Sequence, residues 1–214
     1  MITSIFKKST PINYSLMGIL MVLFFFLYQF HSATVGNTLA LMVQKSGMLI
    51  ILFASLFLSN FIVKKNGLTK NSSYTILFFF LFMLFFPNIM NNMRLLLANF
   101  FILLSMRRLV SLQTLKAPKE KIFDASLWIF VASIFQFWCI LFIILVYISI
   151  IFHVSRDYRN WLIPFVAFFT AATIFILYTL LIDGMAIKNY LDSEVMNVQL
   201  DYFTNEYQNI AFST

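Results

Sequence analysis

The stretch ILFIILVYISIIF (residues 140–152) decides the fold class of this chain. It does not alternate between apolar and polar residues, as a strand of a membrane barrel would. The whole chain has a similar character, with 61% hydrophobic residues, 11% charged residues and a mean hydropathy of +0.88. Soluble domains are far more polar, and only helices and closed barrels cross a bilayer. We therefore predict an all-α, polytopic transmembrane helical bundle.

Outward from this stretch, further apolar runs divide the chain into about six spans, since a helix needs roughly 20 residues to cross the hydrocarbon core. No glycine, and no proline after Pro118, occurs before Phe152, so we predict one continuous helix there, about 50 Å long. The predicted spans are residues 12–30, 46–63, 73–90, 93–110, 122–152 and 162–182 of a transmembrane domain at 1–183, followed by an acidic cytoplasmic tail at 184–214.

Small residues predict where these helices pack, because small side chains mark helix–helix seams in lipid. Ala167 and Ala171 form a small-xxx-small pair in the last span. In the long helix, helical spacing places a second set of small or polar residues on one inward face: Ala125, Ala132, Gln136 and Cys139.

The third and fourth spans are expected to be short or broken. Pro87 interrupts the third, and only about 12 residues, roughly 18 Å of helix, separate Arg94 from Arg107. Either these arginines snorkel to the interfaces, or the two spans form a re-entrant hairpin around residues 87–92. Both alternatives return the chain to the side from which it came.

The orientation follows from the lysines and arginines. With six crossings, eleven of the fifteen lie on the side of the N-terminus, and the other side holds Lys45, Arg94, Arg156 and Arg159. The positive-inside rule then places both termini in the cytoplasm.

The densest polar stretch is HVSRDYRNWLIPF (residues 153–165), which this orientation places on the external, cation-poor side. Three arginines on that side suggest a bound anion, because guanidinium groups bind phosphate and carboxylate bidentately. The alternative is plain anchoring at the interface, with arginines that snorkel and a tryptophan in the aromatic belt. The residues of the predicted anion-binding patch are Arg94, His153, Arg156, Asp157, Arg159, Asn160 and Trp161.

A second basic cluster is predicted on the cytoplasmic side, where it would contact anionic lipid headgroups or act only as a topogenic loop. Asp124 is expected to pair with Arg107 or Lys121. We expect no nucleic-acid partner, since the cations lie between apolar runs, and no metal or cofactor, since the sequence lacks the corresponding motifs. The predicted headgroup contacts are Arg107, Arg108, Lys119 and Lys121.

The segments KEKIFDASLWIF (119–130), DYRNWLIPF (157–165) and MITSIFKKSTPIN (1–13) resemble a family of uncharacterised multi-pass membrane proteins from Bacteroidota, chiefly flavobacteria. The resemblance implies the inner membrane of a Gram-negative bacterium and implies no reaction. Two function classes are expected. One is a non-enzymatic scaffold or subunit of an envelope-assembly complex, with membrane-protein partners. The other is an enzyme or carrier-handling protein for a polyprenyl-phosphate or other anionic lipid at the periplasmic face.

Overall fold

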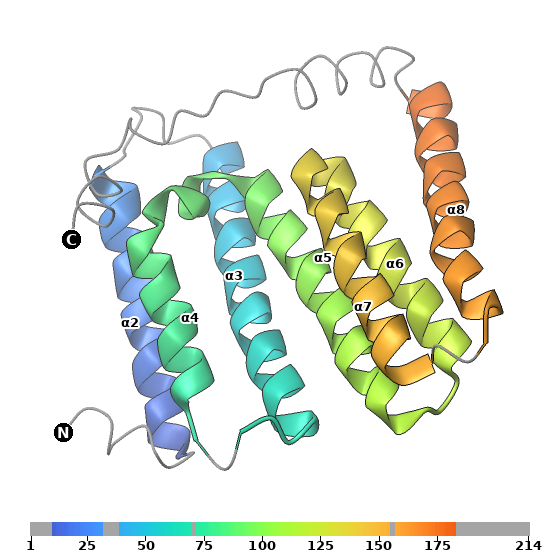
Figure 1. Ribbon diagram of the computed structural model, residues 1–214. Helices are drawn as coiled ribbons and strands as arrows, with labels where there is room; N and C mark the ends of the chain where they lie inside the picture. Colours follow the sequence, from blue (N-terminus) through green and yellow to red (C-terminus); the bar gives the residue numbers. More distant parts are fainter. Residues whose placement is uncertain (1–9, 32–38, 70–71, 155–156, 183–214) are drawn as a thin grey trace, which may run out of the picture. The chain divides into compact units, whose positions relative to one another are not determined.

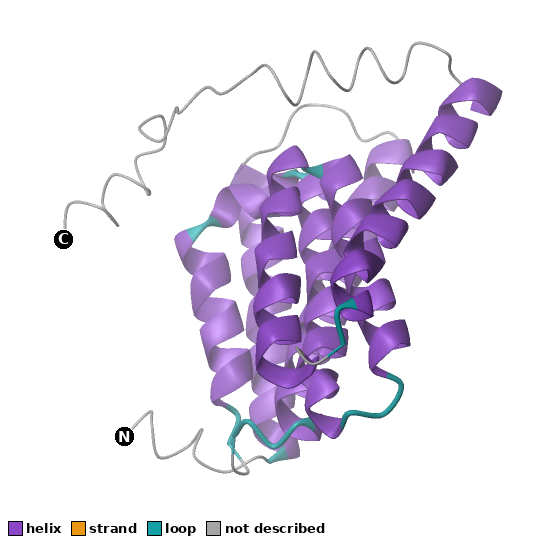
Figure 2. Ribbon diagram, turned by 45° about the vertical axis from the view of Figure 1, so that its right-hand side comes forward, coloured by secondary structure: helices purple, strands orange, loops and turns teal. Residues whose placement is uncertain are grey.

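The computed structural model describes residues 10–31, 39–69, 72–154 and 157–182. These residues form helices joined by short connections, with no strand among them (Figure 2), which confirms the all-α prediction. The segments long and apolar enough to cross a membrane are Pro11–Gln29, Leu41–Lys65, Met93–Thr114, Phe137–Val154 and Arg159–Leu181, and Tyr74–Phe85 is a shorter apolar helix. The chain divides near Leu96 into two compact units, each described separately below.

The first unit contains α2 (Pro11–His31), α3 (Leu39–Lys65), α4 (Tyr74–Phe85) and the 3-10 helix η1 (Pro87–Asn91). The Tyr14 hydroxyl donates to Asn60 Oδ1 at 3.4 Å, so the start of α2 lies beside the end of α3 and these helices run antiparallel. The core of this unit consists of interlocked methionine, leucine, isoleucine and phenylalanine side chains: Met17, Met21, Phe25, Met48, Leu52, Leu56, Ile76, Met83, Met90 and Leu96.

The predicted break between the third and fourth spans is present. After α4, η1 packs on the end of α2, where Gln29 Nε2 donates to Met90 O at 3.4 Å and to Asn91 Oδ1 at 3.0 Å. Asn92 Oδ1 then accepts from two backbone N–H groups of the next helix and caps it. Because η1 lies at the opposite end of this unit from the start of α4 (Figure 1), the arrangement favours a crossing over a re-entrant hairpin.

The second unit is built around α6 (Pro118–Phe135). It also contains most of α5 (Met93–Val110), the 3-10 helices η2 (Ser111–Thr114) and η3 (Phe137–Phe142), α7 (Ile143–Val154) and α8 (Arg159–Ile182). Phe101 of α5 stacks on Trp128 and Phe135 of α6, with ring centroids 5.5 and 5.6 Å apart. The main core of the unit comprises Ile102, Leu109, Leu112, Ile122, Ala125, Ile129, Ala132, Val146 and Ile150.

The prediction of one continuous helix over residues 118–152 is wrong. Helix α6 ends at Phe135, and Gln136 is extended, with φ −143° and ψ 108°. Helix α7 then runs back along α6, so that Ile150 shares a core with Ile122, near the start of α6. The break follows from packing, because a hairpin buries apolar faces of both arms against each other. The aromatic residues around Gln136 have only moderate helix propensity and do not oppose it.

The predicted packing residues are confirmed in part. Ala125 and Ala132 are fully buried, whereas Gln136 and Cys139 lie at the break and are only partly buried. In α8, Ala167 is fully buried and Ala171 nearly so, both clustered with Phe130 of α6. The small pair of the last span therefore lets α6 and α8 approach closely, as such pairs do in membrane bundles.

Candidate functional site

The charged side chains that the structure describes in the second unit gather at one end, which we call the charged end. Four pieces of chain contribute to it: the end of α5 with η2, the start of α6, the connection before α8, and the first turn of α8. The charged end is defined by Arg107, Arg108, Lys119, Lys121, Asp124, Asp157 and Arg159.

An ion pair joins two segments of the charged end that are distant in sequence. Lys119 Nζ lies 3.4 Å from Asp157 Oδ2, so the start of α6 and the start of α8 are at the same end of the unit. Residues 107–121 and 153–161 were predicted on opposite sides of the membrane, and that prediction is wrong. The error has the same cause as the missed hairpin, since one extra reversal brings the second segment back to the first.

A second ion pair joins α5 to α6, between Arg108 Nη2 and Asp124 Oδ2 at 2.9 Å. The sequence predicted Arg107 or Lys121 as the partner of Asp124, and the structure corrects this to Arg108. Lys121 Nζ instead donates to Ser111 O at 2.7 Å and Thr114 Oγ1 at 2.8 Å. These hydrogen bonds link the start of α6 to η2 across the short connection between them.

Asp157 has two partners. Its Oδ1 accepts from the backbone N–H of Arg159 at 3.1 Å, so the carboxylate caps the first turn of α8. This backbone hydrogen bond, followed by the nearby Lys119 ammonium, lowers the pKa of Asp157 below its ordinary value. The carboxylate is therefore ionised at neutral pH and pairs with Lys119 between the starts of α6 and α8.

The remaining predicted residues of this stretch serve helix packing. Asn160 is almost fully buried, and its Nδ2 donates to Val154 O at 3.1 Å, which ties the end of α7 to the start of α8. Trp161 contacts Tyr147 with ring centroids 5.9 Å apart. His153 bonds through Nδ1 to Ser149 O within its own helix, at 3.0 Å. These contacts lie within the protein, and both anion binding and interface anchoring stay predictions for these residues.

The predicted patch of arginines is not assembled by these contacts. Arg159 lies in the charged end, Arg94 lies in the first unit, and Arg156 lies outside the described residues. Anion binding by these arginines together stays a prediction. Among the described residues, no group of three or more histidine, cysteine or acidic side chains could hold a metal ion.

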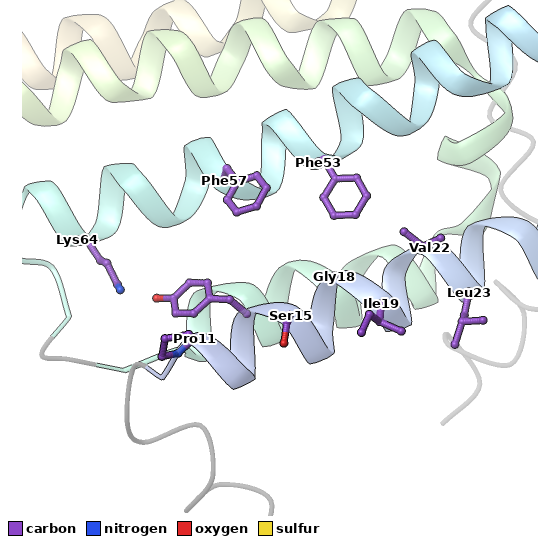
Figure 3. A pocket seen from close by; sticks show the side chains of 10 residues that line it. Pro11, Ser15, Gly18, Ile19, Val22, Leu23, Phe53, Phe57 and Lys64 are labelled. Carbon is purple, nitrogen blue, oxygen red and sulfur yellow. The ribbon is translucent and has the colours of Figure 1, made fainter.

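Several hollows in the described residues adjoin charged side chains. One, of 470 Å³, lies beside the charged end and is lined by Lys119, Glu120, Phe123, Asp124, Ile163 and Val166. A second, of 940 Å³, lies between α2 and α3 and ends at Lys64 (Figure 3). Sequence reasoning missed this second groove. In the sequence, the groove is indicated only by Gly18, which stands among larger, mostly apolar residues.

Comparison of the chain with models of protein families, with curated proteins and with solved structures finds no match.

Proposed function

We propose that this chain is a multi-pass protein of a bacterial inner membrane that works as a non-enzymatic scaffold or subunit of an envelope-assembly complex. Five long apolar segments are compatible with an integral membrane protein. The observation that carries the proposal further is the Lys119–Asp157 ion pair, because it fixes both charged segments at one end. The charged end then lies at the cytoplasmic face.

In this proposal the chain crosses seven times instead of six, because α6 and α7 count as two crossings; this count includes α4 and α6, which are not among the five long apolar segments. Residues 107–121 and 154–159 then lie on the side of the N-terminus, and so does the 64–70 loop. Twelve of the fifteen lysines and arginines fall on that side, and only Lys45, Arg94 and Lys188 fall on the other. This asymmetry is stronger than the one expected for six crossings, and the positive-inside rule places the N-terminus in the cytoplasm and the C-terminus outside.

The ion pairs of the charged end support a scaffold, because the carboxylates of Asp124 and Asp157 pair with cations and join one helix to another. The apolar surface supports helix-to-helix assembly, since α8 leaves Phe169, Leu180 and Leu181 more than half exposed, for lipid or for helices of a partner.

The charged end also suits contact with anionic headgroups. Its cations outnumber its acids, and Arg159 and Lys119 are exposed. The cytoplasmic leaflet carries negative surface potential that attracts such residues. An anionic lipid therefore stays a proposed partner of the chain. Residues 153–161 are now assigned to the cytoplasmic face.

Topology reporters fused at four positions test this proposal. We expect cytoplasmic signals at Lys70, Lys116 and Tyr158 and a periplasmic signal at Lys188, because seven crossings separate the termini. A chain with six crossings would give a periplasmic signal at Tyr158 and a cytoplasmic signal at Lys188. Cytoplasmic signal at Lys188 together with periplasmic signal at Tyr158 would refute the proposed topology.

A further inference from the structure

We infer that the groove between α2 and α3 is a binding site for one anionic phospholipid, with an acyl chain in the groove and the phosphate at Lys64. The inference rests on the proposed function, which places Lys64 at the cytoplasmic leaflet. All the residues that line the groove belong to the first unit.

The groove is an open, mainly apolar depression between two helices, and an acyl chain can lie along it. Its walls are α2 and α3, and Phe53 and Phe57 project from α3 toward α2 (Figure 3). The two rings stack with centroids 6.3 Å apart, which gives one wall a continuous aromatic surface. Opposite them lies Gly18, and the groove is narrow at this point, because a Cβ atom added there would already be in van der Waals contact with Phe53, 3.5 Å from its Cε1.

The length of the groove matches one leaflet. It runs along α2 from Pro11 to Leu23, which is about 18 Å of helix. Half of a hydrocarbon core of ~30 Å is about 15 Å. A chain that enters at the lysine end would therefore reach the bilayer midplane near the far end of the groove.

The positive charge beside the groove lies at one of its two ends. Lys64 Nζ is held over the ring of Tyr14, 4.7 Å from its centroid, and Lys65 Nζ lies 5.3 Å from the centroid of Phe61. Both lysines are exposed at the end of α3. A second hollow of 570 Å³ shares Phe57 and Lys64 with the groove and also contacts Lys65. An apolar groove that ends at two lysines fits a molecule with an acyl chain and a phosphate.

These features favour an anionic phospholipid over a neutral one or a second copy of the chain. A neutral lipid would fill the groove equally well but gain nothing from two lysines at its mouth. A second copy would bring its own Lys64 and Lys65 close to the first pair if the same faces met, and like charges repel.

Native mass spectrometry of the full chain in a mild detergent tests the inference, with phosphatidylglycerol and phosphatidylcholine of identical acyl chains as probes. We expect the chain to retain one phosphatidylglycerol in preference to phosphatidylcholine. Replacing Lys64 and Lys65 by glutamine should remove that preference, at about fivefold per lysine. The matched control is Lys45→Gln, at the other end of α3, which should leave the preference unchanged.

The second part of the experiment blocks the groove between α2 and α3 with a larger side chain. Gly18→Leu should lower retention of both lipids about tenfold, since the leucine side chain occupies the space of about two methylene groups of the acyl chain. Gly47→Leu is the control, because its Cβ would meet only the flexible end of Met93 at 3.9 Å, away from the groove. The double lysine variant does not alter the packed interior, so it remains informative if Gly18→Leu fails to fold.

Equal retention of the two lipids by the unaltered chain would overturn the inference, as would unchanged retention by folded Gly18→Leu. If Gly18→Leu instead converts a dimer to a monomer without loss of lipid, the occupant is a second copy. None of these outcomes changes the reporter signals at Tyr158 and Lys188, so failure of the lipid site is distinguishable from failure of the proposed topology.

Discussion

Replacing Ile150 by alanine is expected to lower the free energy of unfolding by about 2–5 kcal/mol, as deletion of a fully buried isoleucine side chain does. Ile150 has no exposed surface and lies in the core that α7 shares with α5 and α6. Inside a membrane, the burial of apolar area contributes little to folding, because the lipid is apolar as well. The stability is lost because van der Waals contacts are missing around the cavity.

The neighbouring Ile151 provides a matched control. Its side chain is 50% exposed, so Ile151→Ala should change stability by less than about 0.5 kcal/mol. Both variants are measured by chemical unfolding in detergent micelles. Equal losses at the two positions would mean that residue 150 does not face a protein core, and the hairpin of α6 and α7 would be excluded.

Replacing Ala167 by phenylalanine is the second large effect, a destabilisation of about 1–3 kcal/mol. Ala167 is fully buried at the seam of α6 and α8, next to Phe130. The added ring would force the two helices apart, because Ala167 has no exposed surface and its side chain lies against α6. Its measurement is the same unfolding experiment.

Thr173→Phe is the control for this substitution, because Thr173 lies on the exposed side of the same helix. It should be nearly neutral. A neutral Ala167→Phe would show that α8 does not pack closely on α6. The assignment of the small-residue pair as a seam would then fail.

The local chemistry of the sequence was enough to predict the helical class and much of the packing. Unbroken apolar runs leave no alternative to helices in lipid, and alanine spacing located Ala125, Ala132, Ala167 and Ala171 at seams. Pro87 marked the break between α4 and α5 because proline removes a backbone donor and clashes in a helix interior.

The reversal at Gln136 has no such local mark. The turn contains neither glycine nor proline, and its backbone bonds, Gln136 N to Ala132 O and Cys139 N to Gln136 O, need no special residue type. What selects the hairpin is contact between residues far apart in sequence, such as Ile122 and Ile150. Periodicity within one segment does not report such contacts. The candidate site was misplaced for the same reason, since the side assigned to residues 153–161 depends on every reversal before it.

The most direct test of the account is the proximity of residues 119 and 157 in native membranes. Cys139 is the single cysteine of the chain, so a Cys139→Ser background allows Lys119→Cys and Asp157→Cys to be joined by a short bis-maleimide. The account predicts efficient intramolecular cross-linking of this pair and none between Gln136→Cys and Asp157→Cys. A continuous helix over 118–152 would separate residues 119 and 157 by about 50 Å. Absence of cross-linking between residues 119 and 157, with both cysteines reactive toward a single-headed maleimide, would contradict the hairpin, the charged end and the seven-crossing topology together.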